Sequence, residues 1–303
     1  MKRGSEIKEV FAFKDLSLVP KEVKFKPEEI DLKTRLTKSL SLAIPIISAG
    51  HEHVTESKMA IAMASIGGLG VIHGNMPLEK QLQEIQAVKA FDASTITDAT
   101  KDSQGRLMVG ATVGIGKEAF DRTSALSEAG LDIVFVESYY AHNREILETI
   151  RLIRQQVSSK VRVVAGNVFT ADAARSLIEA GADALKVGSI HNGFKTLGTG
   201  IADFTSVSDI VEECSLTNTP VIFDGNIGSA DLLAKSIAAG AETVIVSDLF
   251  AGAVEAAGAD ASSQTNVQTI VNTLIYNLKL SISYTGNKNI RTFIDNSEFV
   301  RIK

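Results

Sequence analysis

The chain reads Gly181-Ala182-Asp183-Ala184-Leu185-Lys186-Val187-Gly188 at one point, where a helix-terminating glycine leads into a short apolar strand. Glycine after a helix readily takes the left-handed conformation that turns the chain into its next element. Residues 184–187 read as a strand buried on both faces, because parallel strands covered by helices are almost continuously apolar. This unit therefore predicts a helix-to-strand step of an α/β fold.

The same unit recurs along the chain. Glycines at 67–68, 130 and 240 each stand shortly before another apolar run. With the remaining apolar runs, the pattern predicts eight strands separated by helical stretches. The predicted strands cover residues 43–50, 69–72, 107–113, 133–136, 161–168, 184–187, 220–223 and 243–246.

Eight strand–helix units that fill the chain predict a closed (β/α)8 TIM barrel, since right-handed crossovers bring successive strands side by side. An open doubly wound sheet is the alternative fold. We expect one domain over residues 1–303, in which residues 1–42 pack on the barrel and residues 266–303 form a final helix and tail. After the first strand, Thr55 is predicted to cap a helix that contains Met59 and Met63.

Composition limits the class of partner. The 303 residues are 45% hydrophobic and 22% charged, with a net charge of −5, which disfavours nucleic acid or an anionic membrane as the main partner. The single cysteine, Cys214, cannot form an internal disulfide, which favours a reducing compartment such as the cytoplasm. The charged N-terminus predicts that there is no signal peptide. The sequence contains no apolar run of about 18 residues, so no membrane span is predicted.

Several short motifs resemble one protein family. They include residues 13–20, 45–49, 70–76, 165–168 and 180–188, the pair Asp224-Gly225, and the tail residues 284–286 and 299–301. These motifs occur in the order and at the spacing of the IMP dehydrogenase / GMP reductase family, which the whole chain resembles. The resemblance implies a barrel that assembles as a homotetramer, with its site at the C-terminal ends of the strands. The regulatory modules that many of the dehydrogenases insert are replaced by the short polar stretch 94–105.

Departures from the family motifs concern the reaction itself. His191 stands where the family has its nucleophilic cysteine, and Cys214 lies on the predicted next helix. A histidine cannot replace a thiolate that adds to a purine carbon. Ser247-Asp248 replaces a glycine–serine pair of the family's phosphate cradle, and a carboxylate there repels a phosphate. The long flap that carries the dehydrogenase's water-activating residues is also missing before residue 266.

Other site residues are retained or changed conservatively. In the family, the residue matching Asp224 binds ribose hydroxyls, and the residue matching Glu137 is a cofactor-side aspartate. The resemblance therefore implies a ligand-binding set at the strand ends. Its members are Asp224, Gly225, Asn226, Ser189, Tyr139 and Tyr140. The two tyrosines replace small residues and are expected to narrow the pocket or stack on a flat ligand.

The histidines raise the question of a metal. All five histidines follow predicted strands, and His51, His53 and His191 depart from the family pattern. Neutral imidazoles beside carboxylates are suitable ligands for a transition metal. An acid–base role without metal, and ordinary hydrogen-bonded histidines in a decayed site, are the alternatives. For Lys186, a structural ion pair is weighed against a Schiff-base role.

Together these features predict a divergent barrel enzyme that acts on a small polar, nucleotide- or ribose-like substrate. The expected catalytic residues are His191, Glu137, His51 and Lys186. The chemistry is acid–base or metal-assisted, with redox chemistry and a nicotinamide as family expectations only. A non-catalytic barrel that binds a ligand or assembles with other subunits is the alternative function.

Overall fold

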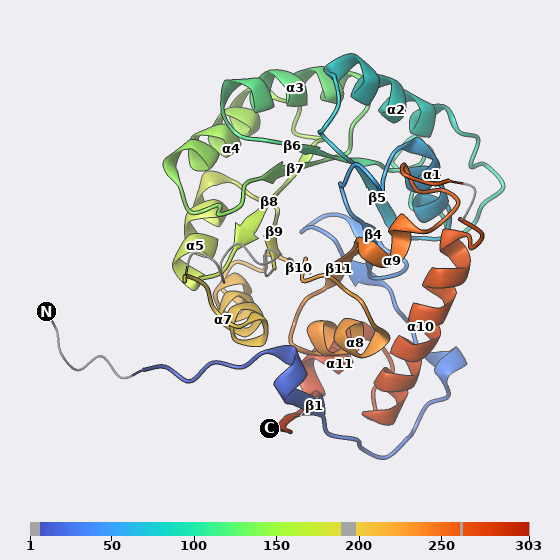
Figure 1. Cartoon of the computed structure of the whole chain (residues 1–303), viewed down its shortest axis with the longest axis vertical. Coiled ribbons are helices and arrows are strands. Elements are labelled where there is room, and N and C mark those ends of the chain that lie inside the picture. The colour runs from blue at the N-terminus through green and yellow to red at the C-terminus, as the bar shows by residue number, and fades with distance from the viewer. Residues whose placement is uncertain (1–6, 189–197, 261–262, 303) are drawn as a thin grey trace, which may run out of the picture.

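The computed structural model describes residues 7–188, 198–260 and 263–302. Its centre is a closed barrel of eight parallel strands (Figure 1). Each strand pairs with the next along the chain, and the barrel closes where β11 pairs with β4. The strands are β4 (Ile46–Ser48), β5 (Leu69–Ile72), β6 (Gly110–Val113), β7 (Ile133–Glu137), β8 (Arg162–Val168), β9 (Ala184–Val187), β10 (Val221–Phe223) and β11 (Thr243–Val246). The predicted TIM barrel is confirmed, and all eight predicted strands are present.

Helices surround the barrel as an outer ring in Figure 1. The ring and its additions comprise α1 (Ser57–Ser65), α2 (Leu78–Ala90), α3 (Gly116–Glu128), α4 (Arg144–Gln156), α5 (Ala171–Ala180), α7 (Asp203–Ser215), α8 (Ala230–Ala238), the short α9 (Asp248–Ala251), α10 (Val267–Tyr284) and α11 (Ile290–Asn296). The long α10 begins after Asn266, whose side chain accepts a hydrogen bond from the Thr269 backbone N–H. In the described part of the chain, none of the helices combines the length and apolar character that crossing a bilayer needs.

Glycines control the return from helix to strand. Gly67, Gly130, Gly181 and Gly240 all have φ between +86° and +113°, the left-handed region predicted from the sequence. An acidic residue two positions after such a glycine can then tie neighbouring strands together. The Asp183 carboxylate, for example, accepts a 2.8 Å hydrogen bond from the backbone N–H of Val163.

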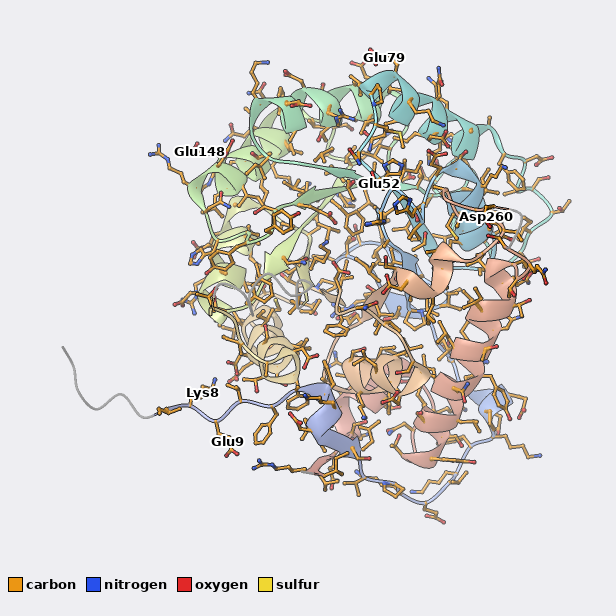
Figure 2. All side chains as sticks on the ribbon, in the orientation of Figure 1. Lys8, Glu9, Glu52, Glu79, Glu148 and Asp260 are labelled. Atoms are coloured by element: carbon orange, nitrogen blue, oxygen red, sulfur yellow. The ribbon has the colours of Figure 1, made fainter. Side chains whose placement is uncertain are left out.

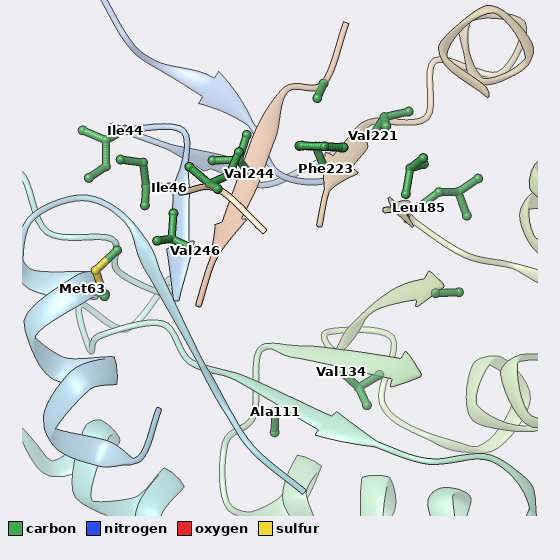
Figure 3. Packing of buried hydrophobic residues seen from close by; sticks show 14 of the residues in the cluster. Ile44, Ile46, Met63, Ala111, Val134, Leu185, Val221, Phe223, Val244 and Val246 are labelled. Carbon is green, nitrogen blue, oxygen red and sulfur yellow. The ribbon is translucent and has the colours of Figure 1, made fainter. Parts of the chain in front are cut away.

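Alternation along each strand divides the core into two layers. Outward side chains such as Leu185, Phe223 and Val244 pack against the helices, as Figure 3 shows for part of this layer. Inward side chains such as Phe135 and Ile222 fill the barrel interior. The interior layer also contains Leu36 and Leu42, from the hairpin of β2 (Thr34–Arg35) and β3 (Ser41–Leu42).

The chain ends are tied to one side of the barrel. Strand β1 (Leu16–Leu18) pairs antiparallel with β12 (Phe299–Arg301), and both follow short helical segments. Phe13, in the 3₁₀ helix η1 (Phe13–Asp15), is buried and packs edge-on against Phe223 of the barrel. A second 3₁₀ helix, η2 (Pro27–Glu29), contacts α10.

Two local predictions differ from the structure. Thr55 does not cap α1: its hydroxyl donates to the Ser48 hydroxyl at 2.9 Å, and the helix begins at Ser57. The Ser57 N–H instead donates to the Glu84 carboxylate of α2 at 2.7 Å. The first strand is also shorter than predicted, because the backbone N–H groups of residues 43 and 44 bond to Gly67 before the barrel pairing starts.

Candidate active site

A cavity of about 470 Å³ lies at the C-terminal ends of the barrel strands. Its lining comes from residues at the ends of six strands: Ala49, Gly50, His51, Glu137, Ser138, Tyr139, Asn167, Lys186, Asp224, Asn226, Ile245 and Ser247. A second hollow, of about 320 Å³, begins at the ends of β5 and β6 and shares Gly50 and Glu137 with the first. Glu137 therefore stands at the junction of two neighbouring hollows.

The centre of the cavity is an ion-pair group, here named the Lys186 site, which consists of Lys186, Glu137 and Asp224. The Lys186 ammonium lies 2.7 Å from Glu137 Oε1 and 2.9 Å from Asp224 Oδ2. The lysine side chain is 8% exposed, whereas the carboxylates are 31% and 25% exposed and reach the cavity. Burial by itself lowers the pKa of Lys186, but the charges of Asp224 and Glu137 and their hydrogen bonds outweigh it, so that pKa is raised.

Strand register explains how three strands supply this group. Glu137, Lys186 and Asp224 each stand two residues after an inward core residue, so alternation points all three into the barrel. Glu137 pairs with Gly166 of β8, and Gly166 pairs with Lys186 of β9. Because Gly166 has no side chain, the carboxylate and the ammonium meet across it. A Cβ at Gly166 would stand 2.5 Å from the Lys186 backbone oxygen.

The raised pKa of Lys186 helps to decide between a Schiff-base role and a structural ion pair. A Schiff-base lysine must lose its proton to attack a carbonyl, and enzymes achieve this by lowering the pKa. Two carboxylates within 2.9 Å have the opposite effect. The geometry therefore favours the structural ion pair of the two roles weighed for Lys186.

Asn167 is a cavity residue that the sequence analysis missed. It is 7% exposed, it lines the cavity, and its side-chain oxygen is buried without a hydrogen-bond partner. Its backbone is fixed by bonds from its N–H to Ser138 and from the Ala141 N–H to its carbonyl, both 3.0 Å long. Asn167 lies where the register of β8 shifts against β9, an irregularity that redirects side chains. A polar residue inside the apolar run 161–168 was the signal available in the sequence.

The histidines are divided between the cavity and its surroundings. His51 lines the cavity, and its ring centroid lies 5.4 Å from that of His53. The backbone N–H of His53 donates to His51 Nδ1 at 3.4 Å. His191 and Ser189 lie outside the described residues. Within the described residues no group of three or more histidine, cysteine or acidic side chains is arranged to hold a metal. A metal site therefore remains a prediction that depends on His191.

Nearby charges belong to a polar rim around His51. Glu52 is hydrogen-bonded by Asn75, and its other oxygen lies 3.7 Å from His53 Nε2. Figure 2 shows Glu52 inside the ring of helices, whereas Glu79 and Glu148 lie on its outer surface. His73 is buried, with Nε2 3.7 Å from Glu56, and burial lowers its pKa, which keeps the ring neutral at pH 7.

The predicted binding residues also differ in position. Tyr139 lines the cavity and is 84% exposed, and Asn226 lines it with a left-handed backbone. Tyr140 instead stacks on Phe169, with ring centroids 6.2 Å apart, and is not part of the cavity lining. Gly225 packs over the Phe223 ring and is likewise not part of the lining.

The Cys214 side chain is a buried thiol and not a reactive thiolate. It lies on α7 with 1% of its surface exposed, and burial, together with nearby Glu213, raises the pKa of its thiol to about 12. A thiol of this kind stays protonated and cannot act as a nucleophile at neutral pH.

The fold is a (β/α)8 barrel with a cavity at the C-terminal ends of its strands, the end at which enzymes of this fold have their active sites. A family model described as the IMP dehydrogenase / GMP reductase domain matches residues 10–266. The chain belongs to the IMP dehydrogenase / GMP reductase family.

Curated relatives agree with this assignment. The chain is 35% identical to an inosine-5'-monophosphate dehydrogenase of Borreliella burgdorferi, over 93% of this chain and 76% of that protein. It is 34% identical to the enzyme of the same name from Cryptosporidium parvum, over 81% of this chain and 69% of the relative. The corresponding enzyme of Halalkalibacterium halodurans is 31% identical over 367 aligned positions, more than the 303 residues of this chain, so that relative contains residues without a counterpart here.

Proposed function

We propose that the chain is a divergent member of its family, an enzyme that binds a small polar, hydroxyl-bearing substrate in the strand-end cavity and acts on it by acid–base chemistry at Glu137. One observation carries the proposal: Glu137 uses Oε1 to bind Lys186 and stands where the two hollows meet. A carboxylate held in this way can accept or return a proton while a neighbouring hollow holds the rest of the ligand.

The other residues of the Lys186 site have supporting roles. Lys186 remains charged, fixes the two carboxylates and cancels one of their negative charges. Asp224, which lines the cavity, is proposed to bind ligand hydroxyl groups, consistent with the ribose-like portion expected from the sequence. His51 lines the same cavity and is proposed as a second proton-transfer group. His191 is retained from the sequence analysis as a further catalytic candidate.

Thioimidate chemistry is not part of the proposal. His191 stands at the sequence position of the family nucleophile, and the buried Cys214 thiol has a pKa of about 12. IMP oxidation with NAD and GMP reduction with NADPH should therefore proceed at no more than trace rates. Replacing His191 with cysteine alone should restore neither reaction.

A nicotinamide dinucleotide does not fit the described lining well. Its pyrophosphate requires cationic or N–H partners. Arg122, the cation of the smaller hollow, bonds to Gln81 and the Met76 carbonyl and lies 3.7 Å from Glu118. Lys186 is already bound by two carboxylates. We therefore assign no step to a nicotinamide.

The test is turnover that depends on Glu137. A panel of ribose-containing and other polyhydroxyl compounds, with and without divalent metals, should reveal a converted compound by NMR. Glu137→Gln should lower its turnover by about 100-fold or more. The matched control is Glu148→Gln, an exposed carboxylate of α4 that pairs with Arg144 away from both hollows, which should leave turnover nearly unchanged. If no compound is converted, the protein is the alternative, a non-catalytic binding barrel.

Two further proposals come from the sequence. His51, His53 and His191 are proposed to share a transition metal, which would raise the melting temperature and be removed by a chelator. Elemental analysis of the wild type and the His191→Ala variant tests this, because a shared site should lose metal in the variant.

A homotetramer is also proposed, and light scattering that gives the 32.3 kDa monomer mass would contradict it.

A further inference from the structure

A third hollow, of about 600 Å³, lies beside the paired chain ends. It shares no lining residue with the two hollows of the candidate active site. Its walls are the loop after β1, the C-terminal end of α10, and the C-terminal end of α11 with the link to β12. Apart from Gly286, its described lining residues all have polar or charged side chains, so the hollow suits a polar ligand.

Two helices present their carbonyl ends to this hollow. Helix α10 ends at Tyr284 and α11 ends at Asn296, and the last carbonyl groups of a helix have no partner within it and carry partial negative charge. Lys21 binds both ends: its backbone N–H donates to the Tyr284 carbonyl and its ammonium donates to the Asn296 carbonyl, each at 2.8 Å. The same ammonium lies 2.7 Å from Glu298. The hollow therefore already binds one primary ammonium group, between a helix-end carbonyl and a carboxylate.

The carboxylates of the lining can bind further cations. The ionised lining side chains are those of Glu22, Asp295, Glu298, Lys21 and Lys24, with a sum of −1. Lys24 lies 3.9 Å from Glu22, and Arg291, outside the lining, lies 2.9 Å from Asp295. All four of these side chains are at least 45% exposed. Exposed pairs of this kind are weak, so a cationic ligand can compete for both carboxylates.

A buried hydroxyl group in the lining is a second observation that indicates a ligand. Ser297 Oγ is buried and has no hydrogen-bond partner in the described structure. The neighbouring amide of Asn287 is also buried, but it donates to Thr285 at 3.0 and 3.1 Å and accepts from Asn296 at 3.2 Å. A buried polar atom without a partner is unfavourable, so a ligand N–H group would satisfy the Ser297 hydroxyl.

We infer that this hollow is a binding site for a small organic polyamine such as spermidine, a flexible chain with several ammonium groups. Its ammonium groups bind the carboxylates of Glu22 and Asp295 and the helix-end carbonyls, as the Lys21 ammonium already does. A compact metal ion fits less well, because the described residues hold no group of three or more acidic, histidine or cysteine side chains arranged around one point. The volume is within the range of roughly 300–1,000 Å³ that small organic ligands occupy. The inference is independent of the function proposed for the strand-end cavity.

Calorimetry with spermidine at low, constant ionic strength tests the inference. The wild type should bind one spermidine per chain, and triethylene glycol, a neutral chain of similar length, should not bind. The double variant Glu22→Gln with Asp295→Asn should bind spermidine at least tenfold more weakly. Lys24→Gln removes a competing cation and should strengthen binding severalfold, whereas Ser297→Ala should weaken it two- to threefold. A bound polyamine connects three segments that are distant in sequence, so spermidine should also raise the melting temperature of the wild type.

A matched double variant controls for general attraction of a polycation to an acidic protein. Asp121→Asn with Glu148→Gln also removes two exposed carboxylates, on α3 and α4, which lie across the barrel from α11 in Figure 1. This control should bind spermidine as the wild type does, and melting curves without ligand establish that every variant is folded. The absence of spermidine binding, or an equal loss of affinity in the two double variants, overturns the inference. So does a loss of binding in Glu137→Gln, which would place the polyamine in the strand-end cavity.

Discussion

Two buried lysines lie at opposite ends of the barrel, and each is paired with two carboxylates. One group stabilises the fold, whereas the other borders the cavity. At the N-terminal end, the Lys89 site consists of Lys89 on α2 with Asp102 and Asp132. The Lys89 ammonium donates to Asp102 at 3.0 Å, to Asp132 at 2.6 Å and to the Leu107 carbonyl at 2.9 Å. All three of its protons therefore have acceptors.

The carboxylates of the two sites differ more than the lysines do. Asp102 also accepts bonds from the backbone of residues 104 and 106, and Asp132 accepts one from the Val109 N–H at 2.8 Å. Their exposed fractions are 10% and 13%. The carboxylates of the Lys186 site are two to three times more exposed and border a cavity. A completed group of charges holds a fold together, whereas an incomplete one can receive a ligand.

The largest loss of stability is expected when the cation of the Lys89 site is removed. Lys89→Met leaves the buried Asp132 carboxylate without its cation and Asp102 with Arg106 alone, and should lower the free energy of unfolding by about 3–5 kcal/mol. Urea denaturation measures this loss. The matched control is Lys117→Met, which breaks an exposed pair with Asp121 and should leave the denaturation midpoint nearly unchanged. A midpoint for Lys89→Met close to that of the control would mean that the site contributes little.

A smaller effect is expected from the pH dependence of Asp102. Its burial raises the pKa, but Lys89 and backbone N–H groups outweigh burial and lower it from 3.8 to about 2. A lowered folded-state pKa stabilises the fold above about pH 4 and loses that contribution as the pH falls towards 2. The difference corresponds to roughly 2 kcal/mol.

The titration of Asp132 opposes this effect, because burial raises the pKa of Asp132 and makes the fold more stable as the pH falls. Comparing the wild type with Asp102→Asn therefore isolates the contribution of Asp102. The variant should be less stable than the wild type at pH 6, and the two should converge as the pH falls from 4 to 2. Parallel stability curves over that interval would show that Asp102 does not titrate as described.

The smallest loss of stability is expected at the open site. Lys186→Met also removes a cation between two carboxylates, but water and the cavity reach Glu137 and Asp224, so unfolding should become easier by only about 1–2 kcal/mol. Thermal denaturation beside Lys89→Met measures the contrast. Equal losses in the two variants would contradict the distinction between a completed and an open site.

The fold was predictable because its signals are local. Glycine followed by an apolar run marked four of the strands, and apolar runs alone marked the other four; both signals are properties of neighbouring residues. Thr55 shows the limit of such signals. Its hydroxyl suited a helix cap, but in the barrel it lies beside Ser48, seven residues earlier, and bonds there instead.

The site was only partly predictable because it depends on register between strands. Glu137, Lys186 and Asp224 were identified singly, yet their meeting depends on Gly166, which leaves room between β7 and β9. Asn167 was missed because counting in steps of two fails at the irregularity in β8. Tyr140 was expected at the ligand, but Phe169 offers it an aromatic surface away from the cavity.

The most direct test of the contrast between the two sites is the affinity of Lys186→Met and Lys89→Met for a hydroxyl-bearing compound that the wild type binds. Calorimetry is performed below the melting temperature of both variants, with the compound of the ribose-containing and polyhydroxyl panel that binds the wild type most tightly. Loss of Lys186 should weaken binding at least tenfold, because Glu137 and Asp224 lose their fixed positions. Lys89→Met should keep the wild-type affinity, although it is the less stable protein. Wild-type affinity in both variants, or an equal loss in both, would contradict the account.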